Sequence, residues 1–370
     1  VEAWHYTDLR RLLSVVPGGS AIAMSAIDPI LDGSAVLSLE NGQASALPSI
    51  AGLNGEMIAD ALRADVGGYV PGYADGDDAV GILNAAFVTG GYRMTVEDGV
   101  ELAQPVELQS RIGGGQAHTA HVIAVGKDAS ATFIDRMTGA PDMEAMVSNV
   151  THVTVKSGAT VNWIVVQELS TDATLLGKLV FDIGEGANVN LFIANYGGKL
   201  IRQEIHADCN GEQGHLNFRA VNLIGGDSHC DVTLVLNHSV ANTTSEETVR
   251  NVITGNGQGV FQGQIRVAQI AQKTDAQMAA NTLLLSDEAG VSVKPELEIF
   301  ADDVICAHGA TVAEIDENHL FYLMARGISE KAARGLLVKA FVAELVEELE
   351  DETLVEVLED RIDAWLEANG

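Results

Sequence analysis

The chain has 370 residues, which is enough for one large domain or for a few ordinary ones. Charged residues make up 20% of it and hydrophobic residues 47%, a balance that excludes a disordered chain and permits a sizeable core. The formal net charge of −31 argues against a nucleic-acid or anionic-membrane partner, because both repel a polyanion.

The sequence contains no uninterrupted apolar run long enough to span a bilayer, and it does not open with a secretion signal. We therefore expect a cytosolic protein without membrane contact. Its three cysteines, Cys209, Cys230 and Cys306, cannot all pair with one another, and nothing resembles a Cys-x-x-Cys metal knuckle. We expect free thiols, with Cys209 and Cys230 packed as small hydrophobic side chains.

Residues 1–95 read as a mixed α/β region. The segment from Trp4 to Arg10 resembles the start of a short helix, and Asp78–Phe87 is a second helical candidate. Between them lie stretches rich in Gly and Ala, so the boundaries of elements here are weakly defined.

Residues 96–312 show a different pattern. Short alternating runs recur, each bounded by Gly, Asp, Asn or Ser, as strands between turns should be. Clear examples are residues 122–125, 161–165, 189–193 and 232–236. No helical pattern intervenes between them, which disfavours folds built from βαβ units.

These strands also repeat. Ala129, Ala159 and Ala187 occupy equivalent places in three similar segments, at offsets of 30 and 28 residues, and Leu216 follows Val189 by 27 in a looser fourth copy. A repeat of this length without helices indicates one supersecondary unit stacked on its neighbour. We therefore predict a mainly β fold, a β-solenoid. A β-sandwich is the main competitor, since it also uses short strands and frequent turns.

Residues 313–370 become helical. Leu320, Leu323 and Met324 share one face, Gly327 stands where a glycine would end that helix, and Ser329 can cap the next one. The predicted apolar stripe of the second helix is Ala333, Leu336, Leu337, Ala340, Phe341 and Leu345.

A third helix is predicted to open at Thr353, because Thr353 and Glu356 have the spacing of a capping box. Its apolar residues are Val357, Leu358, Ile362 and Trp365. This acidic helical region is expected to cap the solenoid and to offer a docking surface for a partner.

One constellation could carry chemistry. In a strand, Cys306 and His308 would point to the same face, so a thiol and an imidazole would be neighbours. Such a pair can bind a soft metal or sulfur, but two ligands cannot complete a metal site, so a partner would have to supply the rest. His118 and His121 follow a Gly-rich turn and are expected on a solvated edge. No nucleotide-binding, serine-hydrolase or zinc-protease signature occurs.

Residues 294–311, from Lys-Pro-Glu-Leu-Glu-Ile-Phe to Cys-Ala-His-Gly-Ala-Thr, closely resemble the signature of the SufB/SufD family. Residues 321–328 look like that family's C-terminal helix pair, and residues 259–263, 271–276 and 281–286 match it too. The Cys-x-His-Gly-Ala-Thr form is similar to the D branch of the family, as is the start of the chain.

The resemblance implies a right-handed parallel β-helix between an N-terminal region and a helical C-terminal domain. It implies a non-catalytic scaffold that assembles nascent iron–sulfur clusters, pairs with SufB through the β-helix and binds the ATPase SufC through its C-terminal helices. The isolated chain could form a homodimer in place of that pairing. No cofactor is expected on the isolated chain, although a flavin, FAD, is associated with the whole complex in that family.

The same resemblance assigns roles to residues. His308 would lie at the interface with SufB, help to assemble the cluster and serve as a metal ligand shared with SufB. Cys306 would lie in the same interface. The segment Asp316–Lys339 would dock SufC, and the residues proposed for this contact are Asp316, Phe321, Tyr322, Arg326, Gly327 and Arg334.

The alternative is a polysaccharide-active β-helix enzyme. Such a site needs carboxylates clustered with Lys or Arg along a groove, often with calcium. Basic residues are sparse across the predicted solenoid, so the scaffold is the favoured interpretation.

Overall fold

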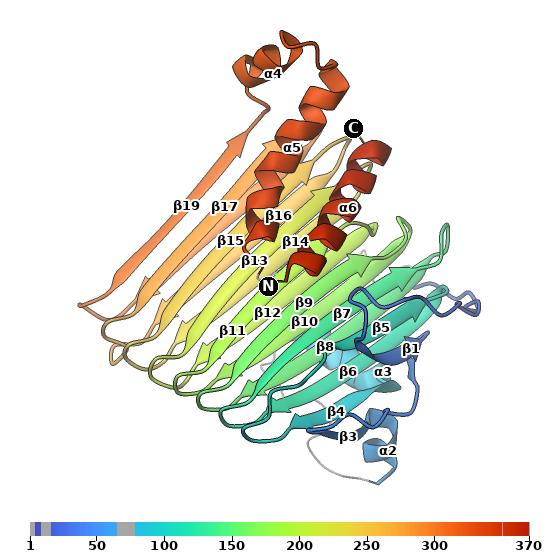
Figure 1. Ribbon diagram of the computed structural model, residues 1–370, viewed down its shortest axis with the longest axis vertical. Coiled ribbons are helices and arrows are strands. Elements are labelled where there is room, and N and C mark those ends of the chain that lie inside the picture. Colours follow the sequence, from blue (N-terminus) through green and yellow to red (C-terminus); the bar gives the residue numbers. More distant parts are fainter. Residues whose placement is uncertain (1–3, 9–15, 65–77, 350, 370) are drawn as a thin grey trace.

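The computed structural model describes residues 4–8, 16–64, 78–349 and 351–369, and it shows two long sheets that face each other along one solenoid (Figure 1). The ten-stranded sheet runs β2 (Gln43–Ala44), β1 (Ala35–Glu40), β5 (Val106–Ile112), β7 (Ser130–Gly139), β9 (Thr160–Glu168), β11 (Asn188–Asn195), β13 (His215–Ile224), β15 (Thr244–Ile253), β17 (Asp275–Leu284), β19 (Ile305–Ala313). The nine-stranded sheet runs β3 (Leu53–Met57), β4 (Gly90–Val96), β6 (Gly115–Val125), β8 (Ala145–Val155), β10 (Ala173–Ile183), β12 (Leu200–Cys209), β14 (His229–His238), β16 (Gln258–Val267), β18 (Gly290–Ile299).

From β4 onward, successive strands alternate between the two sheets, so each turn of the chain adds one strand to each. From β4–β5 to β18–β19 this makes about eight turns, and within each sheet the strands of successive turns pair in parallel. The predicted parallel β-solenoid is therefore confirmed, and the competing β-sandwich is wrong. Among the described residues, antiparallel pairing occurs only at the N-terminal end, in β1–β2, in β3–β4 and in the isolated bridge between Ile50 and Leu53.

The strand register confirms the predicted repeat. Thr160 pairs with Ser130 on one side and with Asn188 on the other, which reproduces the offsets of 30 and 28 residues. The looser fourth copy is also in register, since Val189 pairs with Leu216. Stacking every turn on the same residue positions lets each inward side chain pack on its equivalent one turn away.

Large side chains fill the first half of the solenoid as a column. Phe133, Trp163, Leu191 and Phe218 are in-register neighbours, and all four are buried. The rings of Phe133 and Trp163 stack with their centroids 5.2 Å apart. Burial of such a column supplies most of the favourable free energy of a fold of this kind.

The N-terminal region covers part of the nine-stranded sheet. Helix α2 (Ile58–Arg63) contacts β4, and α3 (Ala79–Phe87) contacts β6, β8 and β10. The second helical candidate is confirmed, with Asp78 as its N-cap accepting from the Gly81 amide at 2.8 Å. Residues 5–7 of the first candidate form a bend, and its last two residues, 9 and 10, lie outside the described residues.

The expectation for His118 and His121 was wrong. Both are buried, because α3 and Tyr92 cover them. His118 Nδ1 lies 2.8 Å from the Ser148 hydroxyl. Burial lowers the pKa of both imidazoles, that of His121 to about 4.

Three C-terminal helices follow β19. They are α4 (Glu317–Met324), α5 (Glu330–Glu347) and α6 (Glu352–Asn369), and the latter two lie across the outer face of the ten-stranded sheet (Figure 1). Their buried residues pack with outward side chains of that sheet, such as Ile164, Phe192 and Val221. Helix α4 buries none of its residues.

Two details of these helices differ from the sequence expectation. On α5 the buried set includes Val338, Val342 and Val346, whereas Leu336 is 51% exposed, so the helix is rotated from the predicted stripe. Helix α6 is capped by Asp351, whose carboxylate accepts from the amides of residues 353 and 354, and not by Thr353. Ser329 caps α5 as predicted. None of the helices that the structure describes is long and apolar enough to cross a bilayer.

Candidate functional site

The predicted Cys–His pair lies on the last turn of the solenoid. Cys306 stands in register with Ala276 and His308 with Met278, and both of these β17 residues belong to the interior. The two side chains therefore share one strand face, as predicted. Cys306 is partly buried against the core, whereas His308 is exposed, because no further strand stacks on β19 in the described chain.

The surroundings of Cys306 favour the neutral thiol. Burial raises the pKa of the thiol, the Asp275 and Glu247 carboxylates add to the rise, and a backbone hydrogen bond at Ala276 opposes it. Among the described residues, no group of three or more His, Cys, Asp or Glu side chains is placed to hold a metal ion. The pair alone can supply two ligands or a proton donor and acceptor, and a complete site needs groups from elsewhere.

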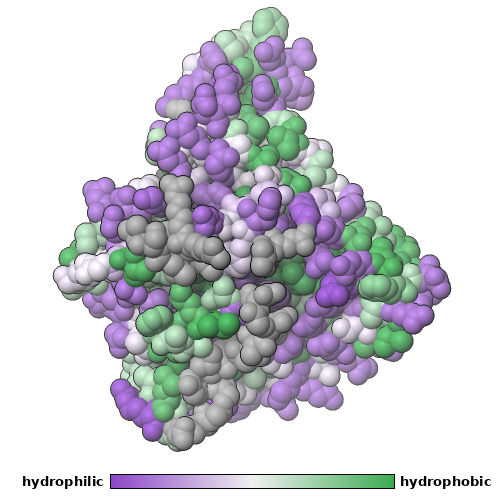
Figure 2. Space-filling model, turned by 180° about the vertical axis from the view of Figure 1, so that it is seen from behind, coloured by the Kyte–Doolittle hydropathy of each residue, from purple (hydrophilic) through white to green (hydrophobic). Residues whose placement is uncertain are grey.

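Within the part of the chain that the structure describes, strands β18 and β19 leave one edge of each sheet unpaired. Beside these edges an apolar corner is exposed, formed by Ile270, Phe300 and Ile305 at 70%, 64% and 66% exposure. A hydrophobic patch is visible at the right-hand edge of the rear view, where the turns of the last strands lie (Figure 2). Unpaired strand edges with adjacent apolar side chains are suited to pairing with another chain.

The residues predicted to bind a second partner gather on α4 and the start of α5, at the opposite end of β19 from Cys306 (Figure 1). Phe321 and Tyr322 are 74% and 55% exposed, and the Arg326 guanidinium lies 3.6 Å from the centroid of the Tyr322 ring. Gly327 follows with a φ of +86°, which a residue with a side chain adopts with difficulty.

Polar contacts fix the two ends of this segment. Asp316 caps α4 by accepting from the Asn318 amide at 2.7 Å, and this bond lowers the pKa of its carboxyl group. Arg334 on α5 pairs with Glu330 one turn earlier at 3.2 Å. We name the exposed surface formed by Phe321, Tyr322 and Met324 the α4 face.

Two grooves flank the α4 face. One, of about 590 Å³, lies between α4 and the end of β17, and the other, of about 510 Å³, lies between α5 and the end of α6. They share Leu285, Ile315, Glu330 and Arg334 in their walls, so they form one depression in which two apolar residues lie beside the Glu330–Arg334 ion pair.

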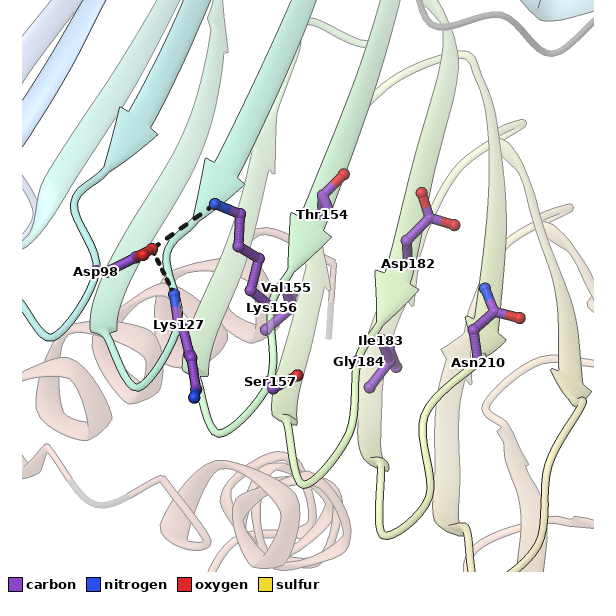
Figure 3. A pocket seen from close by; sticks show the side chains of 10 residues that line it. All are labelled: Asp98, Lys127, Thr154, Val155, Lys156, Ser157, Asp182, Ile183, Gly184 and Asn210. Carbon is purple, nitrogen blue, oxygen red and sulfur yellow. Dashed lines mark hydrogen bonds and ion pairs between the residues drawn. The ribbon is translucent and has the colours of Figure 1, made fainter.

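A third groove, of about 440 Å³, runs over the turns that join the two sheets near the N-terminal end (Figure 3). In it Lys156 Nζ lies 3.6 Å from an Asp98 oxygen that also accepts from the Lys127 amide. It contains none of the predicted site residues.

Sequence reasoning missed the polar residues inside the last turns. Glu247 follows Phe218 in the interior column and is itself followed by Met278 and His308. Its carboxylate is fully buried, and burial raises its pKa to about 8. Extending the repeat beyond its fourth copy would have placed Glu247 in the core.

Comparison with known proteins agrees with the resemblance seen in the sequence. Residues 108–341, more than half of the chain, match the family model described as SUF system FeS cluster assembly, SufBD core domain. The iron–sulfur cluster assembly protein SufD of Escherichia coli K12 is 32% identical over 278 residues, which cover 73% of this chain and 65% of that protein.

Two further relatives extend the comparison. The iron–sulfur cluster assembly protein SufB of Bacillus subtilis is 26% identical over 286 residues, 76% of this chain and 61% of that protein. Protein ABCI7 of Arabidopsis thaliana chloroplasts is 34% identical over 154 residues, 41% of this chain and 32% of that protein. The chain thus spans less than two thirds of the length of these relatives. The extent of the family match shows that the chain belongs to the SufBD family of the SUF iron–sulfur cluster assembly system.

Proposed function

We propose that this chain is a non-catalytic scaffold subunit on which nascent iron–sulfur clusters are assembled, and that it works in a complex with SufB and SufC. The observation that carries the proposal is the uncapped last turn of the solenoid, where an exposed imidazole and a half-buried thiol stand beside unpaired strand edges. Family membership favours this function over a polysaccharide-active enzyme.

SufB is the proposed partner of the β18–β19 end. The backbone groups along these edges can pair with the edge strands of a second solenoid, and Phe300 and Ile305 would lose their exposed apolar surface in the process. A homodimer of the isolated chain would use the same edges, because a related solenoid can be replaced by a second copy.

SufC is the proposed partner of the α4 face. Helix α4 has no buried residue and carries two exposed aromatic rings, so stabilising this chain does not account for those rings. Aromatic and Arg side chains are those most often found at the energetic centre of protein interfaces. The adjoining depression around Leu285 and Ile315 can receive an apolar side chain of the partner.

The nascent cluster is the cargo of the proposed interface. His308 would act there as a ligand or proton carrier, because an imidazole can bind a metal ion or carry a proton. Cys306 would add a sulfur ligand, and SufB would complete the coordination. A flavin in the whole complex remains a prediction, because none of the described features of this chain identifies a place for it.

The test is reconstitution of the complex with His308→Ala in this chain. We expect the three subunits to co-purify as in the wild type and the yield of cluster to fall by at least about tenfold, as for loss of a metal ligand or proton carrier. His215→Ala is the matched control, because His215 is half-buried on an earlier turn and hydrogen-bonded to Thr244 at 2.7 Å. Normal cluster yield in the His308→Ala complex would overturn the role of the imidazole, and failure of SufB and SufC to co-purify with the wild type would overturn the scaffold function.

A further inference from the structure

A methionine lies directly beneath the Cys–His pair. Met278 is the register partner of His308 on the neighbouring strand, and it follows Ala276, the partner of Cys306, by two residues on the same face. The three side chains therefore project from one sheet face into the end of the solenoid. Met278 is 3% exposed, Cys306 is partly buried and His308 is exposed, so they range from the interior to the surface.

The opposite sheet leaves room for the thioether. Gly263 on β16 faces it, and a Cβ at Gly263 would overlap with Met278 Sδ. The sulfur atom is thus held inside the solenoid one turn below the pair. Above it, the inward residues Val293 and Leu297 of β18 are only partly buried, which leaves the end of the solenoid accessible.

Cys306, Met278 and His308 offer softer ligands than those of a zinc or iron site that is built from hard ligands. A thiolate, a thioether and an imidazole are soft or borderline ligands, and thiolate and thioether ligands favour soft metal centres, monovalent copper among them. Zinc, by contrast, is held in proteins by four Cys, His, Asp or Glu ligands. No such group exists among the residues that the structure describes.

We propose that Cys306, Met278 and His308 bind one Cu(I) ion at the open end of the isolated chain. Binding forms a Cu–S bond to Cys306, breaks its S–H bond and releases the proton to solvent, and the oxidation state of the metal does not change. The inference uses two residues of the proposed cluster interface but does not depend on that function, because it concerns the chain without SufB.

The test is an anaerobic titration of the purified chain with Cu(I) in competition with the chromogenic chelator bicinchoninate. We expect one equivalent to bind, and Cys306→Ser, His308→Ala and Met278→Leu each to weaken binding by at least about tenfold. Leu is chosen because it conserves the volume of Met. Met137→Leu is the matched control, since Met137 is equally buried on β7, far from the last turn, and its replacement should leave the affinity unchanged.

Two results of the titrations would overturn the proposal. One is wild-type affinity in the Met278→Leu or the Cys306→Ser chain, and the other is tighter binding of Zn²⁺ than of Cu(I). X-ray absorption of the copper-loaded wild type tests the same claim without a variant, because it must show two sulfur atoms and one nitrogen around the metal. A single sulfur neighbour would contradict it even if a variant failed to fold.

Discussion

Phe218 and Glu247 are register neighbours on β13 and β15, and both side chains point into the solenoid. The interior column therefore changes from an aromatic ring to a carboxyl group between one turn and the next. Among the described residues, neither oxygen of Glu247 has a hydrogen-bond partner of good distance and angle. A buried carboxylate of this kind is costly when ionised, which is why burial raises its pKa from 4.5 to about 8 while the Ser245 hydroxyl and the Arg219 guanidinium oppose the shift only in part.

Replacing Glu247 by Met should stabilise the chain at alkaline pH. The folded chain keeps the proton of Glu247 to a higher pH than the unfolded chain does, so the free energy of unfolding falls as the pH rises from about 4.5 to about 8 and stays low above that. Glu247→Met removes this loss. We expect a gain on the order of 1–4 kcal/mol at pH 8.5 and a smaller one at pH 5.5, measured by urea unfolding.

Glu185→Gln is the control for this experiment, because Glu185 is an exposed turn residue and its replacement leaves the interior unchanged. Its unfolding free energy should follow the wild-type curve at both pH values. Parallel pH dependence of the wild type and Glu247→Met would show that the carboxyl group is not the source of the alkaline loss.

A second column of the interior is held by hydrogen bonds between side-chain amides. Asn195 Nδ2 donates to Asn222 Oδ1 at 2.7 Å, and Asn222 Nδ2 donates to Asn251 Oδ1 at 2.8 Å. All three residues are at most 2% exposed. Asn222→Ala would leave Asn195 Nδ2 with only its longer bond to Gln203 Oε1, at 3.3 Å, and Asn251 Oδ1 without its donor. We therefore expect the free energy of unfolding to fall by about 2–4 kcal/mol.

Urea unfolding measures this loss, and Asn256→Ala provides the comparison. The side chain of Asn256 makes one hydrogen bond, to Asp227 at 2.8 Å, in an exposed turn where water can replace it. The control should change stability by less than about 0.5 kcal/mol. Equal losses in the free energy of unfolding would mean that the buried amide column stabilises the chain no more than an exposed hydrogen bond does.

The features that sequence reasoning predicted are those set by local spacing. The offsets between Ala129, Ala159 and Ala187 determine the register of three turns, and the spacing of Cys306 and His308 determines their common face. Both follow from the two-residue period of a strand and from stacking of equivalent positions. They do not depend on what else packs against the sheet.

The features that it missed depend on contacts between distant segments. Burial of His118 comes from α3, and rotation of α5 comes from the outward side chains of the ten-stranded sheet, which select Val342 over Leu336 as the contact. The helix periodicity allows either rotation, because several apolar rows are present on α5. The exposure of His308 likewise depends on where stacking of the strands stops.

The proposed pairing with SufB can be tested at β19. Val312 is 53% exposed on this edge strand, and a Lys side chain at an edge strand opposes pairing with another strand. We expect Val312→Lys to reduce co-purification of SufB with this chain while SufC still binds. The fold should be intact, because the exposed Val312 side chain buries little surface and its replacement therefore removes little buried area.

Ile82→Lys is the matched control for the edge, since Ile82 is 55% exposed on α3 in the N-terminal region. It should leave SufB binding unchanged. Loss of SufB in both variants would indicate a general effect of added charge, and retention of SufB by Val312→Lys would remove β19 from the proposed interface.

The proposed SufC contact calls for a point substitution and not for removal of the C-terminal helices. Deleting residues 316–370 would uncover Ile164, Phe192 and Val221 on the outer face of the ten-stranded sheet, so lost binding could reflect lost folding.

Phe321 is 74% exposed and belongs to a helix without buried residues, so Phe321→Ala should change stability by less than about 0.5 kcal/mol. As an aromatic side chain at the proposed centre of the contact, it should cost at least about tenfold in SufC affinity. Calorimetric titration with SufC measures this, with Phe87→Ala, 57% exposed on α3, as the control. Because both replacements remove an exposed phenyl ring from a helix surface, equal affinities in the two variants would place the SufC contact away from the α4 face.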